Sequence, residues 1–222
     1  MVPADTGYRM EESTCDCRPN DLDPCGLHSE CINQLTHMEC GENCPALSKC
    51  KNKRFKKMQY PQSEVFKTDW GGWGLKTLVD VERGQLVHEY VGEIVDQTEL
   101  ERRIEVSHQT QIKNYYFLTL DSKRTIDAGP KANTARFMNH SCDPNCQTQK
   151  WTVDGDYRIG LFANEFIPSG TELTFNYQFA SMGDQKISCF CNSKNCSGKL
   201  GEKVDKDKSQ DETVMSIDTV CS

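Results

Sequence analysis

Two short stretches hold side chains that can do chemistry, at a spacing too dense for ordinary structure. Residues 136–145 read Arg-Phe-Met-Asn-His-Ser-Cys-Asp-Pro-Asn, and residues 172–177 read Glu-Leu-Thr-Phe-Asn-Tyr. The first is too polar for a core element and, with its Asn-His pair, cysteine and turn-forming Asp-Pro, too compact for an idle loop. The second is strand-like and ends in a tyrosine. We therefore expect the rest of the chain to be organised around these two stretches.

The 13 cysteines indicate metal binding. Clustered cysteines in a reducing compartment are metal ligands more often than disulfides. We expect such a compartment because the first residues, Met-Val-Pro-Ala-Asp, form no apolar signal run. Two tetrahedral zinc ions need eight ligand positions, so seven thiolates suffice if one sulfur bridges both ions. Seven lie close together near the start of the chain: Cys15, Cys17, Cys25, Cys31, Cys40, Cys44 and Cys50.

The expected division places Cys25 on both ions. One ion would take Cys15, Cys17, Cys25 and Cys31, and the other Cys25, Cys40, Cys44 and Cys50. His28 or His37 as an eighth ligand is the alternative, although a histidine in a polar loop is more often a surface residue. Farther on, Cys189, Cys191 and Cys196 leave a third zinc one ligand short, and Cys142 is the expected fourth. Cys146 and Cys221 are left without a role.

The charge is acidic overall and unevenly distributed. A net charge of −7 argues against a simple nucleic-acid-binding domain. Residues 202–222 hold six acids and three lysines, whereas residues 49–57 hold six basic residues and no acid. The basic strip Lys51, Lys53, Arg54, Lys56 and Lys57 could contact the phosphates of DNA. A solvated linker is the equally weighted alternative.

Short strands separated by turns predict a mostly β fold between residues 63 and 179. No run approaches the roughly 18 apolar residues needed to cross a bilayer. The Asp154-Gly155 pair predicts a hairpin turn. A single clear helix should begin at an N-cap, Thr98, with Glu101 three residues on, and end near Gln109. Strands are expected at 64–68, 75–79, 86–95 (a strand pair), 115–120, 125–127, 147–153 and 157–164.

The two polar stretches resemble the signature motifs of SET-domain lysine methyltransferases. The pattern of cysteines over residues 15–50 is similar to the AWS (associated with SET) module, and Cys142 with Cys189, Cys191 and Cys196 is similar to the post-SET module. Residues 126–131, 135–140 and 147–151 resemble the branch that methylates histone H3 at lysine 36, and within it the nuclear-receptor-binding SET-domain (NSD) group.

The resemblance implies a fold of small curled β-sheets with a knot-like C-terminal crossing, one inserted helix and flanking zinc-bound modules. The implied domains are an AWS module with its basic linker at 15–62, a SET catalytic domain at 63–179, and a post-SET loop and zinc module at 180–200. Residues 1–14 are expected to be disordered or a linker, and residues 201–222 a disordered acidic tail.

The implied activity is methyl transfer from S-adenosylmethionine to a lysine of nucleosomal histone H3, lysine 36 by resemblance, in the nucleus. Phe175 leaves room for at least dimethylation. The implied cofactors are S-adenosylmethionine and three zinc ions, and the partners are the H3 tail and nucleosomal DNA. The alternative is a catalytically inactive SET module that acts as a zinc-bound chromatin scaffold.

The resemblance also implies roles for individual residues. The channel for the substrate lysine would be lined by Tyr90, Tyr116, Phe175 and Tyr177, with Tyr177 as the catalytic residue that orients the amine. A lid over this channel is expected at residues 178–188. For Gly72 the rival interpretation is an ordinary turn, and for Asn139 and His140 a buried hydrogen-bonding pair. The implied cofactor-binding residues are Gly72, Trp73, Gly74, Asn114, Tyr115, Tyr116, Arg136, Asn139, His140 and Tyr177.

Overall fold

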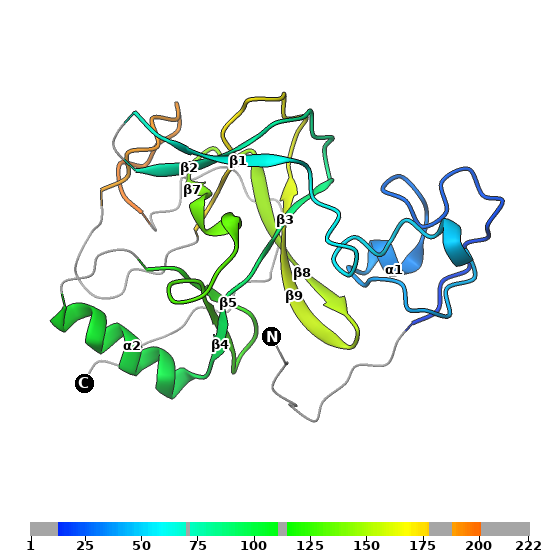
Figure 1. Ribbon diagram of the computed structural model, residues 1–222, viewed down its shortest axis with the longest axis horizontal. Coiled ribbons are helices and arrows are strands. Elements are labelled where there is room, and N and C mark those ends of the chain that lie inside the picture. The colour runs from blue at the N-terminus through cyan, green and yellow to red at the C-terminus, as the bar shows by residue number, and fades with distance from the viewer. Residues whose placement is uncertain (1–12, 70–71, 111–114, 178–187, 201–222) are drawn as a thin grey trace.

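The computed structural model describes residues 13–69, 72–110, 115–177 and 188–200 (Figure 1). Most of the terminal segments expected to be disordered, and of the expected lid, lies outside these residues. In chain order the elements are α1 (Ile32–Leu35), η1 (Leu47–Lys49), β1 (Ser63–Lys67), β2 (Trp73–Thr77), β3 (Leu86–Tyr90), β4 (Glu93–Val95), α2 (Gln97–Gln109), β5 (Phe117–Thr119), β6 (Thr125–Asp127), η2 (Thr134–Phe137), β7 (Asn139–His140), β8 (Cys146–Val153), β9 (Asp156–Ala163) and β10 (Thr174–Phe175).

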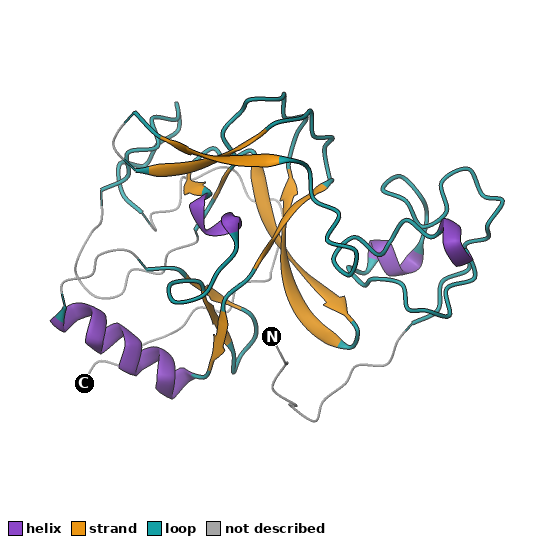
Figure 2. Ribbon diagram, viewed as in Figure 1, coloured by secondary structure: helices purple, strands orange, loops and turns teal. Residues whose placement is uncertain are grey.

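The strands form three small sheets, as the predicted mostly β fold requires (Figure 2). β1 pairs with β2, β4-β6-β5 form a second sheet, and the largest has the order β3-β9-β8-β10-β7. Within the described residues, no helix is long and apolar enough to cross a membrane.

The expected C-terminal crossing lies in the five-stranded sheet. β10 is parallel to β7 on one side and to β8 on the other, although both strands precede it in the chain. Phe175 is the partner of His140 in β7 and of Cys146 in β8. The last strand is thereby inserted between two earlier ones, and it brings the two polar stretches side by side.

The predicted hairpin at Asp154-Gly155 is confirmed. β8 and β9 pair over eight consecutive residue pairs, from Cys146–Ala163 to Val153–Asp156. The two turn residues have φ values of 53° and 79°. A turn with positive φ at both central positions matches the twist of the flanking strands, which is why Asp-Gly favours it.

The strand pair expected at 86–95 divides between two sheets. β3 pairs with β9 in the five-stranded sheet, while β4 pairs with β6 in the three-stranded one. Gly92 lies between them, and a Cβ there would come within 2.4 Å of the Asp127 carbonyl oxygen. Only glycine allows the chain to pass this close to another backbone.

The predicted helix exists, but its N-cap is Asp96 and not Thr98. The Asp96 side chain accepts a hydrogen bond from the Glu99 amide at 2.8 Å, and its backbone is extended (φ −84°, ψ 177°). Asp96 follows β4 directly, so the chain turns into the helix as soon as the strand ends. The helix ends at Gln109, as expected.

An arginine fastens α2 to the three-stranded sheet. Arg103 donates to Glu99 at 2.7 Å on its own helix, to Glu93 of β4 at 2.8 Å, and to Asp127 of β6 at 2.5 Å. Asp127 is buried, and Arg103 is the cation that pairs with its carboxylate. Burying a carboxylate is unfavourable unless it is paired.

The cysteine-rich module lies to one side of the sheets (Figure 1). It is joined to the hairpin by a parallel bridge between Met38 and Thr152 of β8, and by the Glu39 amide donating to the Thr152 carbonyl at 2.9 Å. His37 stacks on Trp151 with ring centroids 5.3 Å apart. Backbone pairing and a ring contact thus dock the module on β8.

Arg103→Ala should lower the free energy of unfolding by roughly 2 kcal/mol, because it leaves the Asp127 carboxylate buried without its cation. Thermal unfolding monitored by circular dichroism measures the change. Arg102→Ala is the matched control, since Arg102 is 63% exposed and, within the part of the chain that the structure describes, pairs with Glu99 alone; exposed pairs contribute little. Equal loss in both variants would contradict the role given to Arg103.

Candidate functional site

Four aromatic rings gather where β3, β5 and β10 approach each other. The centroids of Tyr90 and Phe175 lie 6.1 Å apart in an edge-on contact, and those of Phe175 and Tyr177 lie 4.9 Å apart. The Tyr90 hydroxyl donates to the Tyr116 carbonyl at 3.1 Å. Tyr90 and Phe175 belong to the buried core, with Tyr116 and Tyr177 packed against it. The structure therefore brings together all four residues expected to line the channel.

Both polar ends of Tyr177 are fixed by the first polar stretch. Its hydroxyl donates to the Met138 carbonyl at 2.8 Å, and its backbone amide donates to Nδ1 of His140 at 3.2 Å. Burial is the main cause that raises the pKa of the Tyr177 hydroxyl well above its usual value. At neutral pH this hydroxyl is therefore a neutral, oriented hydrogen-bonding group and not a phenolate.

His140 connects the aromatic group to the third cysteine cluster. Because Nδ1 accepts from Tyr177, the neutral ring carries its proton on Nε2, which lies 3.5 Å from Cys142 Sγ. Burial lowers the pKa of His140, which favours this neutral form. One imidazole thus contacts both the expected catalytic residue and an expected metal ligand.

Asn139 fastens the turn that holds the expected cofactor residues. Its side-chain nitrogen donates to the Trp73 carbonyl at 3.1 Å and to Glu172 Oε1 at 2.8 Å. Trp73 itself is 57% exposed, unusually open for an indole. Sequence reasoning gave Glu172 no role, although it opens the second stretch. Its contact with Asn139, 33 residues away, singles it out.

Arg136 packs against the aromatic group and offers a hydrogen-bond donor to a ligand. Its guanidinium carbon lies 4.4 Å from the centroid of the Tyr116 ring, a cation–π distance. Its Nε is buried and has no hydrogen-bond partner among the described residues. An unpaired buried donor is costly, so an acceptor from a ligand would fit there.

Two expected cofactor residues are not part of this arrangement as described. Asn114 lies outside the described residues. Tyr115 stacks on Phe117 at 6.1 Å and meets His108 of α2 edge-on at 6.4 Å. Its cofactor role stays a prediction.

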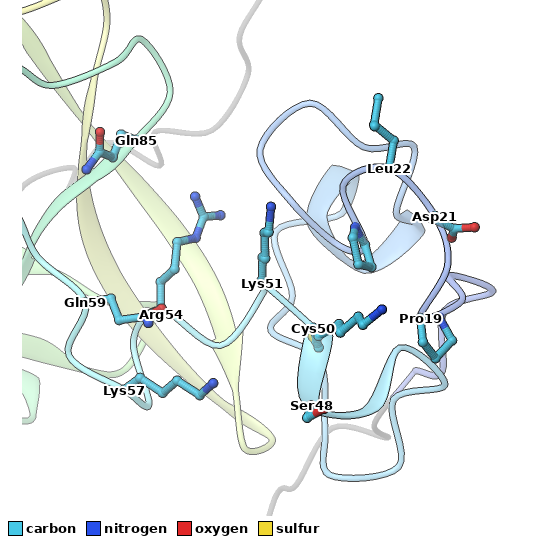
Figure 3. Close-up of a pocket in the computed structure, with 12 residues that line it drawn as sticks. Pro19, Asp21, Leu22, Ser48, Cys50, Lys51, Arg54, Lys57, Gln59 and Gln85 are labelled. Atoms are coloured by element: carbon cyan, nitrogen blue, oxygen red, sulfur yellow. The ribbon is translucent and has the colours of Figure 1, made fainter.

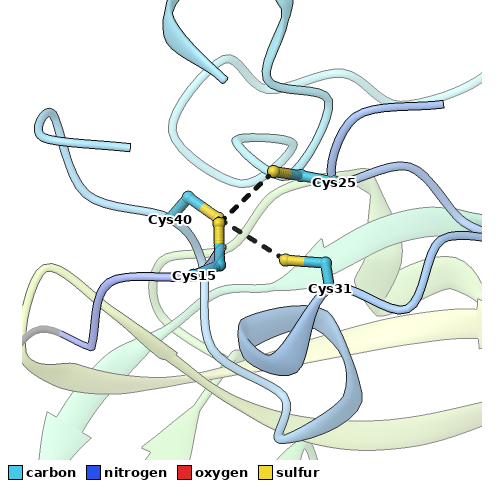
Figure 4. A group of neighbouring side chains, drawn as sticks. All are labelled: Cys15, Cys25, Cys31 and Cys40. Atoms are coloured by element: carbon cyan, nitrogen blue, oxygen red, sulfur yellow. Dashed lines mark hydrogen bonds between the residues drawn. The ribbon is translucent and has the colours of Figure 1, made fainter. Parts of the chain in front are cut away.

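Six of the seven N-terminal cysteines form two overlapping sets of mutually close sulfurs, and Figure 4 shows the first. Within the module, Sγ of Cys15 lies 3.6 Å from that of Cys25 and 3.9 Å from that of Cys40. Sulfurs on a tetrahedral zinc, with Zn–S near 2.3 Å, lie about 3.8 Å apart, whereas a disulfide needs about 2.05 Å. The sets are Cys15, Cys25, Cys31, Cys40 and Cys25, Cys40, Cys44, Cys50.

The second set and the sharing of Cys25 agree with the expected division. In the first set, Cys40 stands where Cys17 was expected, because Cys40 lies between the two groups. Burial is the largest cause that raises the pKa of Cys17 to about 11, and the nearby Cys31 adds to it. Cys17 is therefore close to the cluster, and its role as a ligand stays a prediction.

The third cluster contains Cys142 with Cys189, Cys191 and Cys196. Sγ of Cys142 lies 3.7 Å from that of Cys189, and the Cys142 amide points at Cys191 Sγ at 3.4 Å. Together with Cys196 they form one group whose sulfurs lie within 4.8 Å of one another. Cys146 is fully buried in the core, and burial raises the pKa of its thiol to about 12, as for an unreactive core residue.

The basic strip is only partly available to a partner. Lys53 and Lys56 have side chains 13% and 17% exposed; both pair with Glu42, and Lys56 also pairs with Asp154. Arg54 lies over the Trp151 ring, 5.6 Å from its centroid. These three side chains take part in the junction between module and sheets.

A groove of about 730 Å³ lies between the cysteine module and the linker that leads to β1 (Figure 3). Lys49, Lys51, Arg54 and Lys57 line it, and Asp21 is the one acid among its described lining residues. Lys51 also pairs with Asp23 at 2.7 Å. The groove is thus cationic, and none of its lining residues belongs to the aromatic group.

Comparison with protein families finds two matches. The SET domain model matches residues 72–178, and the AWS domain model matches residues 21–58. The first match spans both polar stretches and all four aromatic residues, and the second spans five of the seven N-terminal cysteines.

Among curated proteins, the chain is similar to the human "Histone-lysine N-methyltransferase, H3 lysine-36 specific", 53% identical over 88% of this chain. It is 51% identical to mouse "Histone-lysine N-methyltransferase NSD3" over 84% of the chain, and 43% identical to human "Histone-lysine N-methyltransferase SETD2" over 86%. The chain spans 7%, 13% and 8% of these relatives' lengths, respectively.

Proposed function

This chain belongs to the SET-domain family, and we propose that it transfers methyl groups from S-adenosylmethionine to a lysine of histone H3 in nucleosomes. The observation that carries the proposal is the buried aromatic group closed by Tyr177, next to an open turn with an exposed Trp73. Lysine 36 is the proposed target because relatives at 53% identity are named for it. The proposed location is chromatin in the nucleus.

The residues around the turn fit S-adenosylmethionine. A Cβ on Gly74 would lie 2.7 Å from the Phe66 ring and 2.8 Å from Glu172 Oε1, so position 74 has no room for a side chain. The exposed indole offers an aromatic face, and the unpartnered Nε of Arg136 offers a donor. When bound, the cofactor supplies an electrophilic methyl group on a sulfonium. The residues proposed to hold it are Gly72, Trp73, Gly74, Asn114, Tyr115, Tyr116, Arg136, Asn139, His140 and Tyr177.

The aromatic group would bind the substrate lysine and make it nucleophilic. A free lysine has a pKa near 10.4, so little of it is neutral at pH 7. Between the rings of Tyr90, Tyr116, Phe175 and Tyr177 water is excluded, and desolvation disfavours the ammonium form. Tyr177 would orient the amine through its fixed hydroxyl. The rate gain comes mainly from positioning. Because Phe175 has no hydroxyl, the amine has room to rotate after one transfer, and at least dimethylation is proposed.

Tyr177→Phe should reduce turnover on nucleosomes by at least roughly 100-fold, because it removes the group that orients the amine. Mass spectrometry of the product should locate wild-type methylation at H3 lysine 36 and detect a dimethylated form. The melting temperature should fall by only a few degrees, since one lost hydrogen bond contributes about 1 kcal/mol.

Tyr60→Phe is the control for the loss of a hydroxyl. Tyr60 donates to Glu89 at 3.2 Å and packs in a separate apolar cluster with Phe55 and Trp151. The Tyr60→Phe enzyme should keep most of its turnover on nucleosomes. A Tyr177→Phe enzyme that keeps most of its activity would show that the hydroxyl is structural. A wild type that binds the cofactor without transferring methyl groups would favour the inactive scaffold.

The three cysteine clusters would each hold one zinc ion, with Cys25 shared between two of them. The proposed ligands are Cys15, Cys17, Cys25, Cys31, Cys40, Cys44, Cys50, Cys142, Cys189, Cys191 and Cys196. The packed cysteines of the AWS module are buried, whereas those of the last cluster are only half-buried. Because few other apolar residues are buried with the AWS cysteines, metal binding should supply much of that module's folding free energy.

Metal analysis should find three zinc ions per chain, and mild chelation should remove the ion of the half-buried last cluster first. Cys196→Ser should lose one ion. Cys146→Ala should lose none, because Cys146 lies in the core away from the clusters. An active preparation with one zinc ion or none would contradict the proposal.

The cationic groove would contact the phosphate backbone of nucleosomal DNA. This narrows the expected DNA-binding strip, because the side chains of Lys53 and Lys56 are only 13% and 17% exposed. Lys51 pairs with Asp23 but is 61% exposed, and it lines the groove with Arg54, Lys57 and Lys49, which was absent from that strip. Each phosphate contact releases condensed counterions, so binding should weaken with salt.

Lys49→Gln, Lys51→Gln and Lys57→Gln together should weaken nucleosome binding and lower the slope of log K against log salt by roughly 2 to 3. Lys53→Gln with Lys56→Gln is the matched control and should lower it little. Binding measured from low to moderate salt gives the slopes, and activity on a short H3 peptide should not change. Equal loss on the peptide, or an equal effect of the control pair, would contradict a DNA-binding groove.

A further inference from the structure

The amide of Asn139 has only one possible orientation. Its side-chain nitrogen faces two oxygens, the Trp73 carbonyl at 3.1 Å and Glu172 Oε1 at 2.8 Å. Because both can only accept, the atom facing them must be the NH₂ group, and both of its hydrogens are used. The amide oxygen is then left to accept a hydrogen bond from another group.

Glu172 is packed under the Gly72–Trp73–Gly74 turn as well as bonded to Asn139. Its Oε1 lies 2.8 Å from the position that a Cβ of Gly74 would occupy. The carboxylate therefore fills the space that the missing side chain leaves. Three segments distant in the sequence, the start of β2, β7 and the residue two before β10, meet at this one carboxylate.

The backbone of Glu172 is held on two sides, which directs its side chain. Its carbonyl accepts from the Asn145 side chain at 2.7 Å, and a bridge pairs it with Lys76 of β2. The next amide, that of Leu173, donates to the Leu75 carbonyl at 2.7 Å. Few conformations are left to the carboxylate, so little entropy is lost in forming its contacts.

We infer that Glu172 is a positioning residue of the cofactor site: it holds the Asn139 amide and the turn in one arrangement, with the Asn139 oxygen oriented to accept from an N–H or O–H donor of S-adenosylmethionine. This inference rests on the proposed function, which supplies the ligand. A hydrogen bond to a carboxylate is stronger than one between neutral groups, which suits a fastening at a partly exposed site.

The charge of Glu172 also reaches the aromatic group. After burial and the neighbouring Tyr90 and Tyr116, Glu172 is among the causes that raise the pKa of Tyr177. The carboxylate thus helps to keep the Tyr177 hydroxyl protonated. It also adds a negative charge to the site of a cationic ligand, which is favourable.

Two conservative variants separate the effect of the length of the Glu172 side chain from that of its charge. Glu172→Gln keeps the length and an oxygen acceptor but loses the charge, whereas Glu172→Asp keeps the charge but is one methylene too short to reach Asn139. Calorimetry should give Glu172→Gln a dissociation constant for S-adenosylmethionine within about threefold of wild type. The dissociation constant of Glu172→Asp should be at least roughly tenfold higher, the loss expected when a donor is left unpaired. The KM for the cofactor should follow, with kcat changed less. Glu165→Ala, at an exposed acid, should change nothing.

A double-mutant cycle tests whether Glu172 acts through Asn139. Glu172→Asp combined with Asn139→Ala should bind no more weakly than Asn139→Ala alone. If the double variant instead lost affinity by the product of the two single losses, Glu172 would act independently of Asn139, and the inference would be overturned. If Glu172→Gln bound S-adenosylmethionine as weakly as Glu172→Asp does, the inference would also be overturned, since the length of the side chain would then make no difference.

The fastening can be measured without the cofactor. Hydrogen exchange of residues 72–74 and 139 in the cofactor-free protein should be faster in Glu172→Asp than in wild type, and close to wild type in Glu172→Gln. Unchanged exchange in Glu172→Asp would overturn the inference whatever the enzyme does. A wild type that neither binds the cofactor nor methylates histone would instead overturn the proposed function, and the exchange result would stand by itself.

Discussion

The pairing of β10 with β7 is the constraint on which the site depends. Only two residue pairs join these strands, yet they set Thr174 beside Asn139 and Phe175 beside His140. Tyr177 follows two residues later, which is why its hydroxyl reaches Met138 and its amide reaches His140. So short a strand has few ladder hydrogen bonds, and Asn145 reinforces it by bonding both the Glu172 carbonyl and the Thr174 amide. Hydrogen bonds from a side chain thus add to the few backbone hydrogen bonds that hold β10 in place.

The protein uses different sources of stability in its parts. The sheets enclose an apolar core that includes Tyr90 and Phe175, with Tyr116 and Tyr177 packed against it, so the aromatic group of the site is continuous with the core. The buried cluster of the AWS module consists of cysteines with Ala46, too small a group for the hydrophobic effect to order. We propose that bound metal holds this module together, and its docking to Trp151 and Thr152 adds to it. The cationic groove lies where these parts meet, so its shape depends on both.

The chemistry proposed for the site needs orientation more than charge. Burial favours the protonated form of Tyr177 and the neutral form of His140, so the residue proposed to orient the amine and the imidazole bonded to its amide are both neutral dipoles. The charged groups stand around them: the Arg136 guanidinium over the Tyr116 ring, and the Glu172 carboxylate under the turn. A cationic cofactor and an uncharged nucleophile suit such surroundings, because oriented neutral groups need not reorganise during transfer.

The sequence by itself determined the features whose causes are local. The Asp154-Gly155 turn, the single long helix, the cysteine clusters and the two polar stretches follow from residue types at short spacing, and the crossing came from the resemblance that those stretches carry. Only the tertiary structure decided which side chains from distant segments meet. It moved the helix cap to Asp96, set Cys40 in the first cysteine set, turned Lys53 and Lys56 toward acids of the protein, and placed Glu172 against Asn139 and Gly74. Such contacts depend on how the strands cross, and no local pattern encodes the partner of a side chain 33 residues away.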